Sequence, residues 1–386
     1  MTISTAEPTR LRAVLGSDYT RAIALYLLVR LVGVAVLALA AAWHDRDLLE
    51  RLTAWDGQWY LQLAQYGYDR FPEPVLDAEG RVFPAATLAF FPLYPAIVAG
   101  VGTLPGVGLE FAALLVSTGA GVVAACGLVR LARQIDPRPR VGLLLVALWA
   151  GAPLAITLSM AYTEALFAAC AVWCLVFLLE RQWLPAGGLC LLAGLVRSTA
   201  TVLIVAVVLA ALVAAGRGQD RGRALAGAAL APLGLLGFWA YVAQRTASVT
   251  GWQDIEARGW NTRWDWGRET AEFVTRTLAT GESVMDVGSV LVLFGAVGLA
   301  VAAVRLRLPW PLIVYGAGVV LLVAGTAGLP FAKPRFLLPA MFVLLIPIAL
   351  ELAGRRRSTM IAGVAAAIAL GSWYSAYALT GWSYAI

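Results

Sequence analysis

Long apolar runs separated by short polar segments make up most of this chain. Most of the runs reach the roughly 20 residues that an α-helix needs to cross a bilayer, at about 1.5 Å per residue. The pattern predicts membrane-spanning helices over residues 22–43, 109–133, 141–160, 165–180, 224–244, 284–304, 309–328, 335–352 and 358–380.

One apolar stretch, residues 184–215, is too long for a single crossing and carries Arg197, Ser198 and Thr199 near its middle. The segments on either side of it both contain arginine, so both are expected on the same side of the membrane. We therefore predict a hairpin of two short helices with Arg197 at its tip. The expected total is about eleven membrane helices.

Arginine-rich segments orient the chain, because positively charged loops stay in the cytoplasm. Arg10, Arg12 and Arg21 place the N-terminus inside, which leaves residues 44–108 and 245–283 as extracytoplasmic loops and the C-terminus outside. Residues 90–104 are apolar enough for a further span. A span there would move the arginines of residues 130–140 outside, so we expect an in-plane or re-entrant helix instead.

The composition agrees with a polytopic membrane protein. Of the 386 residues 61% are hydrophobic and 13% charged, and the mean hydropathy is +0.79, so a soluble class is excluded. We expect one all-α integral-membrane domain over residues 1–386. The net charge of +6 comes from arginines in short loops, so no nucleic-acid partner is expected. Four cysteines lie in apolar runs and are expected to pack there, with no disulfide and no metal site: Cys126, Cys170, Cys174 and Cys190.

The segment over residues 55–69 is the most unusual polar part of the chain. At helical spacing, Trp55, Trp59 and Tyr66 fall on an apolar stripe, while a glutamine-rich stripe faces the other way. Such a helix is expected to lie flat on the membrane with its rings at headgroup depth. Asp56, in its first turn, would be partly desolvated by the rings and could act as a general base. Alternatively, Asp56 only caps the helix.

Further charged residues fall at the outer ends of the predicted spans. Glu164 begins one span, Arg197 lies at the hairpin tip, and Lys333 and Arg335 precede another span. Charges inside lipid are costly and tend to mark functional sites, and a guanidinium group suits phosphate oxygens. The alternatives are a helix-terminal acid at Glu164, a snorkelling Arg197, and headgroup anchoring by the other two cations.

Three other features invite an interpretation. Residues 251–266 combine four tryptophans with charged residues, which suits a sugar- or headgroup-binding surface but is also typical of an interfacial tryptophan belt. Arg30, inside the first span, is expected to snorkel or to pack against a neighbouring helix, and the alternative is a contact with a lipid phosphate. His44, the only histidine, is expected at the surface.

Several segments resemble motifs of the PIG-V-type mannosyltransferases, a branch of the membrane-embedded class C glycosyltransferases (GT-C). They follow one another in the order and approximate spacing of that family and cover nearly the whole chain. They are WDGQWYLQLAQYGY at residues 55–68, FPLYP at 91–95, AYTEALF at 161–167, LLAGLVRSTATVL at 191–203 and, more weakly, KPRFLLPAMFVLL at 333–345.

The resemblance implies a GT-C-type helical bundle in the cell membrane that transfers mannose, with inversion, on the extracytoplasmic face. The donor would be polyprenyl-phosphate-mannose, and the acceptor a hydroxyl of a glycolipid or glycan. Asp56 matches the family's base, with Arg197, Lys333 and Arg335 as candidates for holding the donor phosphate. Candidate substrate-binding residues are Trp55, Trp59, Tyr60 and Tyr162. No cofactor or metal is required, and membrane lipids surround the protein.

The family pattern is not matched everywhere. Some GT-C families carry two adjacent acids in the first loop, whereas Gly57 follows Asp56 here, so a second acid would come from Asp69 or Glu164. The alanine-, glycine- and arginine-rich composition suggests a bacterial protein. The alternatives are a GT-C enzyme with another lipid-linked sugar, such as aminoarabinose or glucose, and a lipid or glycan transporter or flippase.

Overall fold

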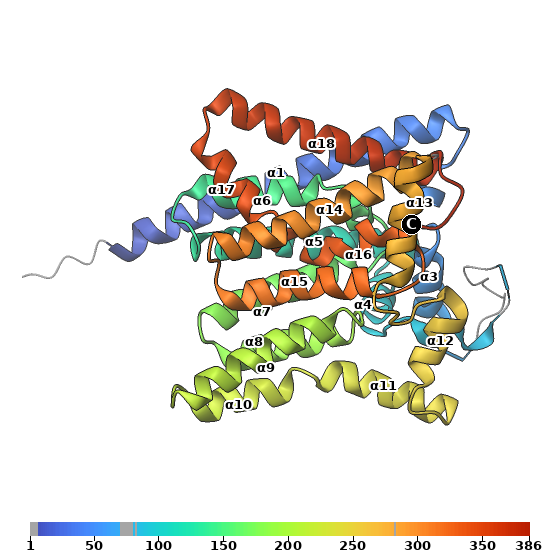
Figure 1. Ribbon diagram of the computed structural model, residues 1–386, viewed down its shortest axis with the longest axis horizontal. Coiled ribbons are helices and arrows are strands. Elements are labelled where there is room, and N and C mark those ends of the chain that lie inside the picture. The colour runs from blue at the N-terminus through green and yellow to red at the C-terminus, as the bar shows by residue number, and fades with distance from the viewer. Residues whose placement is uncertain (1–6, 70–79, 82, 282) are drawn as a thin grey trace, which may run out of the picture.

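The computed structural model describes residues 7–69, 80, 81, 83–281 and 283–386, and this part of the chain folds into helices without a β-strand (Figure 1). The first half contains α1 Glu7–Trp43, α2 Leu48–Leu52, α3 Asp56–Tyr66, the 3₁₀ helix η1 Pro84–Ala89, α4 Leu93–Gly102, α5 Leu109–Arg133, α6 Pro139–Ala150, η2 Ala155–Ser159, α7 Glu164–Leu179 and α8 Trp183–Gly194. The second half contains α9 Ala200–Gly216, α10 Arg221–Leu230, α11 Leu233–Thr246, α12 Gly251–Trp260, α13 Arg268–Thr280, α14 Val284–Arg305, α15 Trp310–Gly325, η3 Pro330–Ala332, α16 Lys333–Leu344, α17 Ile346–Gly354 and α18 Arg357–Thr380.

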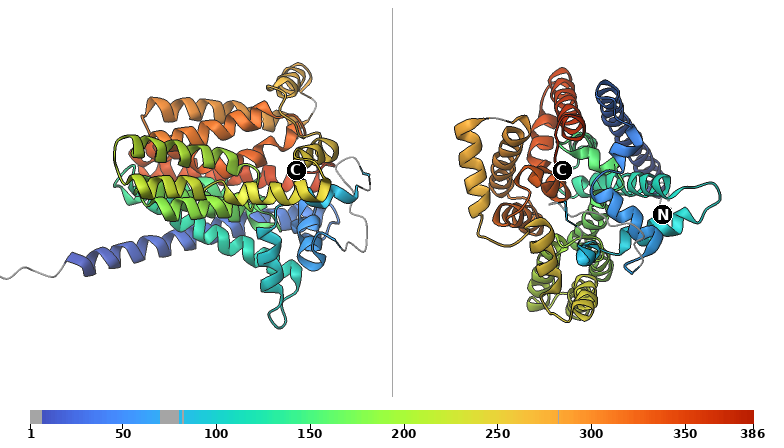
Figure 2. Two further views of the ribbon diagram at one scale, coloured as in Figure 1. Left: turned by 90° about the horizontal axis from the view of Figure 1, so that it is seen from below. Right: turned by 90° about the vertical axis from the view of Figure 1, so that its right-hand side faces the viewer.

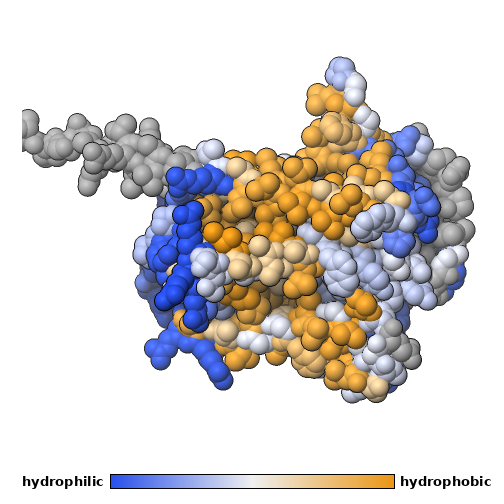
Figure 3. Space-filling model, turned by 90° about the horizontal axis from the view of Figure 1, so that it is seen from above, coloured by the Kyte–Doolittle hydropathy of each residue, from blue (hydrophilic) through white to orange (hydrophobic). Residues whose placement is uncertain are grey.

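The long helices lie side by side with their axes roughly aligned (Figures 1 and 2). Short helices α3, α12 and α13 gather at one end of this bundle, on the right in Figure 1. The loops that join α9 to α10, α14 to α15 and α17 to α18 lie at the opposite end. On the face shown in Figure 3, an apolar band lies between two more hydrophilic ends, as expected for a protein whose sides face lipid.

By length and composition, five helices of the described chain are able to cross a membrane, or six if the bent pair α16–α17 is one span. Six further apolar helices have only 10–17 residues. The all-α polytopic fold expected from the sequence is therefore confirmed, while the expected total of eleven spans stays a prediction. As expected, the stretch over residues 184–215 divides into α8 and α9, which pack against each other.

The span expected over residues 141–160 is wrong as a continuous helix. Helix α6 ends at Ala150, and the chain then runs irregularly, apart from η2, to the start of α7 at Glu164. Gly151 and Pro153 explain the break, since neither favours a helix interior. This segment is almost entirely buried in protein, which is the condition for irregular backbone at membrane depth.

Side chains from other elements bond the backbone of this irregular segment. The guanidinium of Arg30 donates to the carbonyl of Ala150 at 2.7 Å and to the hydroxyl of Ser159 at 2.9 Å. The hydroxyl of Ser117 donates to the carbonyl of Tyr162 at 3.2 Å. Arg30 is 6% exposed and thus packs inside the protein, so the snorkelling alternative is wrong.

Trp59 of α3 lies inside the protein rather than among lipid headgroups, which corrects the expectation for this ring, whereas Trp55 is half-buried and Tyr66 is exposed. Trp59 is 5% exposed and stacks on Phe90 with ring centroids 5.2 Å apart. The ring of Trp59 also lies 6.1 Å from that of Trp260 of α12. Helix α3 is thus fixed to the bundle by protein contacts, and its first turn is held in one position.

The apolar segment after Phe90 forms α4, a helix of 10 residues. At 1.5 Å per residue it is about 15 Å long, half of what a crossing requires. This length agrees with the expected in-plane or re-entrant helix.

Candidate functional site

Asp56 is the first residue of α3 and follows an unusual turn. The preceding residue, Trp55, has φ 57° and ψ −119°, a backbone conformation that L-residues rarely adopt. Gly57 packs against the irregular segment, since a Cβ there would lie 3.4 Å from the Cβ of Ala161. The turn and this close approach fix the carboxylate of Asp56 at the edge of the bundle, with 22% of its side chain exposed.

The carboxylate of Asp56 pairs with Arg335 rather than capping a helix. Arg335 Nη1 donates to Asp56 Oδ2 at 2.7 Å across 279 residues of sequence. Arg335 belongs to the first turn of α16, and its side chain is 4% exposed. Its guanidinium also lies over the rings of Tyr162, at 5.3 Å, and Phe336, at 4.7 Å. These rings hold the cation in place and exclude water from it.

Glu164 and Arg197 form the second ion pair of the site. Arg197 Nη1 lies 2.6 Å from Glu164 Oε1 and 2.9 Å from the hydroxyl of Thr163. The side chain of Glu164 is fully buried and that of Arg197 is 14% exposed. Arg197 reaches this position because the hairpin breaks between α8 and α9, as the sequence analysis expected.

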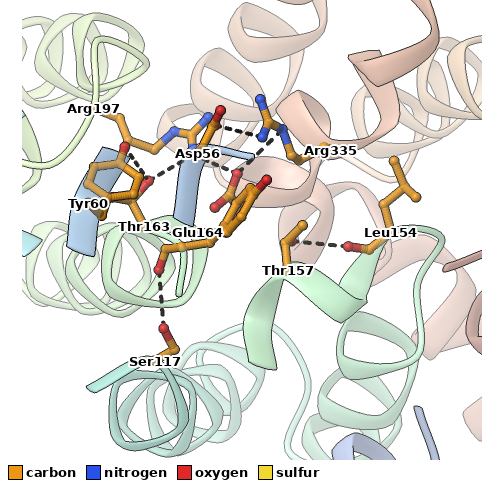
Figure 4. Close-up of polar contacts among 10 residues, drawn as sticks. Asp56, Tyr60, Ser117, Leu154, Thr157, Thr163, Glu164, Arg197 and Arg335 are labelled. Atoms are coloured by element: carbon orange, nitrogen blue, oxygen red, sulfur yellow. Dashed lines mark hydrogen bonds and ion pairs between the residues drawn. The ribbon is translucent and has the colours of Figure 1, made fainter. Parts of the chain in front are cut away.

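The two pairs join into one charge cluster of Asp56, Glu164, Arg197 and Arg335 (Figure 4). Arg335 Nε lies 3.8 Å from Glu164 Oε1, which links the pairs. Two carboxylates and two guanidinium groups balance, as buried charges require. Within the described chain, Arg335 Nε and both oxygens of Glu164 make no regular hydrogen bond, so part of their bonding capacity is unused.

A series of hydroxyl and ring contacts connects the charge cluster to neighbouring helices. The hydroxyl of Tyr60 lies 3.5 Å from that of Thr163, which itself accepts from Arg197. The ring of Tyr60 packs edge-on against Tyr94, whose hydroxyl contacts Ser117 at 3.0 Å. These contacts connect α3, α4 and α5 to the residues at the start of α7, so the site rests on several helices.

The structure does not bring Asp69 or Lys333 into the charge cluster. Asp69 lies beyond the far end of α3 and pairs with Arg245 of α11. The ammonium of Lys333 donates to the carbonyls of Val323 and Thr326 at 2.8 and 2.6 Å, where α15 ends. Lys333 thus caps a helix C-terminus, an established place for a cation.

The aromatic candidates for substrate binding have different surroundings. Tyr162 is fully buried, and Trp59 and Tyr60 are 5% and 6% exposed, so all three rings contact protein. Trp55 is half-buried and packs against an apolar cluster around Leu52 and Tyr374. The buried rings support the charge cluster in this structure.

Glu256 of α12 belongs to the site although the sequence analysis did not single it out. Its side chain is half-buried, and its backbone carbonyl accepts a hydrogen bond from the amide of Thr262 at 3.2 Å. Burial, reinforced by the negative charge of Asp56, raises the pKa of Glu256 to about 8. In the sequence, only its position four residues before Trp260, in a loop rich in tryptophan, could have indicated Glu256 as a site residue.

Across the part of the chain that the structure describes, no three or more His, Cys, Asp or Glu side chains are grouped closely enough to hold a metal ion. The charge cluster itself contains two carboxylates, each engaged with a guanidinium group. Its evident chemical ability is to accept a proton at a carboxylate and to bind an anion between two cations.

No protein-family model matches the chain, and none of the curated proteins matches it either. Solved structures do share its fold. The crystal structure of ArnT from Cupriavidus metallidurans bound to undecaprenyl phosphate has a TM-score of 0.57 and 12% identity, covering 92% of this chain and 76% of that one. The crystal structure of the same ArnT in the apo state has a TM-score of 0.51 and 13% identity, covering 84% of this chain and 70% of that one. A crystal structure of the Archaeoglobus fulgidus oligosaccharyltransferase in complex with Zn and sulfate has a TM-score of 0.48 at 14% identity, covering 92% and 52%.

The similarity to ArnT establishes that this chain has the same polytopic helical fold. The resemblance to the PIG-V-type branch stays a prediction, as does the bacterial origin.

Proposed function

We propose that this protein is an inverting glycosyltransferase that moves mannose from polyprenyl-phosphate-mannose to an acceptor hydroxyl on the extracytoplasmic face of a cell membrane. The observation that carries this proposal is the charge cluster, in which the partly exposed carboxylate of Asp56 pairs with Arg335, and Glu164 links Arg335 to Arg197. The fold supports it, because the similar ArnT structure contains undecaprenyl phosphate. The sequence motifs support the mannose donor.

Asp56 would remove the acceptor proton. One oxygen, Oδ2, is engaged by Arg335, which leaves Oδ1 to accept from the acceptor hydroxyl. As the proton moves to Asp56, the acceptor oxygen forms a bond to the anomeric carbon. The bond from that carbon to the phosphate oxygen breaks on the opposite face, so the anomeric configuration inverts.

Arg197 and Arg335 would hold the phosphate. The departing polyprenyl phosphate gains one negative charge when its bond to the sugar breaks, and preorganised guanidinium groups stabilise that charge. In the free protein the same groups pair with Glu164 and Asp56, so they are kept in place without a ligand. The donor phosphate would accept hydrogen bonds from both guanidinium groups.

A transporter or flippase remains the competing class of function. Such a protein would place charges at mid-depth in several spans, close to broken helices in matched halves. The charged site residues instead gather at the end of the bundle that carries α3 and α12, which favours an enzyme.

The proposal is tested with purified protein in lipid nanodiscs, labelled polyprenyl-phosphate-mannose and a panel of glycolipid and glycan acceptors. We expect sugar transfer by the wild type and a loss of about 10²–10⁴-fold in Asp56→Asn, the range for removing a general base. Asp69→Asn is the matched control and should stay active, because Asp69 pairs with Arg245 outside the cluster.

Two results would contradict the proposal. Full activity of Asp56→Asn would exclude this residue as the base. If the wild type transfers no sugar from any polyprenyl-phosphate donor, the proposed transferase activity is excluded. If it transfers only a sugar other than mannose, the proposed donor is wrong. Mass spectrometry of glycolipids from cells lacking the protein would identify the acceptor.

A further inference from the structure

Residues 161–164 join the irregular segment after α6 to the start of α7 and lie beside the charge cluster. The last of them is itself a member of the cluster (Figure 4). The hydroxyl of Thr163 accepts a hydrogen bond from Arg197 at 2.9 Å. The guanidinium of Arg335 lies 5.3 Å from the ring centroid of Tyr162. Three consecutive residues thus carry or contact three of the four charges.

Ala161 connects the same four residues to the remaining charge. A Cβ on Gly57, which follows Asp56 in the sequence, would lie 3.4 Å from the Cβ of Ala161. The amide of Ala161 also donates to the carbonyl of Leu52 at 2.9 Å. A displacement of this short stretch would therefore disturb all four charges of the cluster together.

The backbone before these residues has no long helix to fix its position. It runs from the end of α6 at Ala150 and contains only the short helix η2, which ends at Ser159. Backbone of this kind keeps its place at membrane depth through contacts with other elements. One side chain of α1 supplies two such contacts. Arg30 donates from Nη1 to the carbonyl of Ala150 at 2.7 Å and from Nε to the hydroxyl of Ser159 at 2.9 Å.

Arg30 occupies a place where a cation is costly. It lies in the middle of the candidate span Asp18–Trp43 and is 6% exposed. Within the described chain its bonding partners are two neutral oxygens rather than a carboxylate, and its Nη2 has no hydrogen-bond partner. An apolar side chain would fill the same space without the cost of burying a charge. A cation at this depth therefore indicates a role beyond packing.

We propose that Arg30 is a positioning residue for the glycosyl transfer. By tying the end of α6 and the end of η2 to α1, its guanidinium sets where residues 161–164 lie, and therefore how Arg197 and Arg335 meet the donor phosphate. This inference rests on the proposed function and adds to it a residue that acts through others. Misplacing reacting groups by about 1 Å can cost on the order of 10²-fold in rate.

The experiment measures kcat and KM for polyprenyl-phosphate-mannose in nanodiscs, with the acceptor of the panel that the wild type uses best and with rates divided by the amount of folded protein. Arg30→Met removes both bonds. We expect its kcat to fall about 10–100-fold and its KM to change by less than about threefold, because alignment counts more in the transition state than in binding.

Ser159→Ala breaks only one of the two bonds and leaves Arg30 on the carbonyl of Ala150. We expect kcat to fall about 3–10-fold, the equivalent of one hydrogen bond, with KM unchanged. If Arg30→Met does not fold, this variant decides the question. Wild-type kcat in Ser159→Ala would overturn the inference.

Two matched controls separate positioning from a general loss of stability. Gly227→Ala disturbs the crossing of α8 and α10, because a Cβ there would lie 2.4 Å from the carbonyl oxygen of Trp183. It should lower the melting temperature and keep the wild-type kcat. Thr157→Val removes a hydroxyl of η2 that donates to the carbonyl of Leu154 within the same turn at 3.0 Å, and it should also keep the wild-type kcat. A loss of kcat in either control as large as that in Arg30→Met would overturn the inference.

Hydrogen exchange followed by mass spectrometry tests the positioning without any transfer reaction. We expect the amides of residues 151–164 to exchange faster in Arg30→Met and Ser159→Ala than in the wild type, and at the wild-type rate in Gly227→Ala. If the wild type is active but exchange is unchanged in Arg30→Met, only the inference about Arg30 is overturned. If the wild type transfers no sugar from any lipid-linked donor, the proposed function fails and the positioning role fails with it.

Discussion

Arg197 shows how a buried charge in this protein depends on its partner. Arg197→Ala leaves the fully buried carboxylate of Glu164 without its 2.6 Å ion pair. Breaking a buried pair on one side costs about 3–5 kcal/mol, so we expect a clear drop in thermal stability together with weaker donor binding. Thermal melting and titration with polyprenyl-phosphate-mannose measure the two effects.

The double variant Arg197→Met, Glu164→Gln separates these effects. Replacing both partners of a buried pair is often close to neutral for stability, so the melting temperature should recover much of the loss. Donor affinity should not recover, because the phosphate-binding guanidinium is still absent. Wild-type donor affinity in the double variant would exclude a phosphate role for Arg197.

The sequence identified Glu164, Arg197 and Arg335 because charges next to long apolar runs are costly, and Asp56 because it begins an aromatic amphipathic helix in a polar loop. It did not separate Lys333 from Arg335, since their difference lies in the backbone carbonyls that α15 presents to Lys333. Glu256 was missed for a similar reason. Its loop has the composition of an interfacial tryptophan belt, and only the ring contact between Trp260 and Trp59 shows that α12 lies next to α3.

At the scale of elements, glycines set the distance between helices α8 and α10. A Cβ on Gly227 would lie 2.4 Å from the carbonyl oxygen of Trp183, which is too close for real atoms. Such small-residue crossings drive helix association in lipid. We expect Gly227→Ala to destabilise the protein by about 1–3 kcal/mol, the usual cost of overpacking.

Gly222→Ala is the matched control on the same helix. No atom lies within 4 Å of the position that its Cβ would occupy, so only the helix propensity changes, by up to about 1 kcal/mol in favour of alanine. Thermal unfolding of both variants in the same detergent measures the two changes in stability. Equal melting temperatures would contradict a tight crossing at Gly227.

Apolar runs predicted where helices occur better than where they break. The hairpin at Arg197 was visible because a cation interrupts an overlong run. The break after Ala150 was not, since residues 151–160 are as apolar as a true span, and Arg30 and Ser117 bond the carbonyls of Ala150 and Tyr162 on either side of them. This break matters for function, because it brings Thr163 and Glu164 to the charge cluster.

At the scale of the whole molecule, the arginine-rich loops and the site occupy opposite ends of the bundle. The loop between α17 and α18 lies at one end, while α3, α12 and α13 lie at the other (Figure 1). From the positive-inside rule we predict that the first end lies in the cytoplasm and the site on the outer face. Charge along the sequence was sufficient to predict this separation, but only the folded chain shows that α4 is too short to cross between the ends.

This topology can be tested by labelling single cysteines in sealed vesicles with an impermeant reagent. Ser358→Cys, at the exposed start of α18, should react only from the cytoplasmic side, and Val249→Cys, 91% exposed between α11 and α12, only from the outer side. Leu104→Cys, 56% exposed just after α4, is the decisive position. Because α4 is about 15 Å long, Leu104→Cys should not react from the cytoplasmic side. Its reaction from the cytoplasmic side would make α4 part of a crossing and would contradict the in-plane or re-entrant helix.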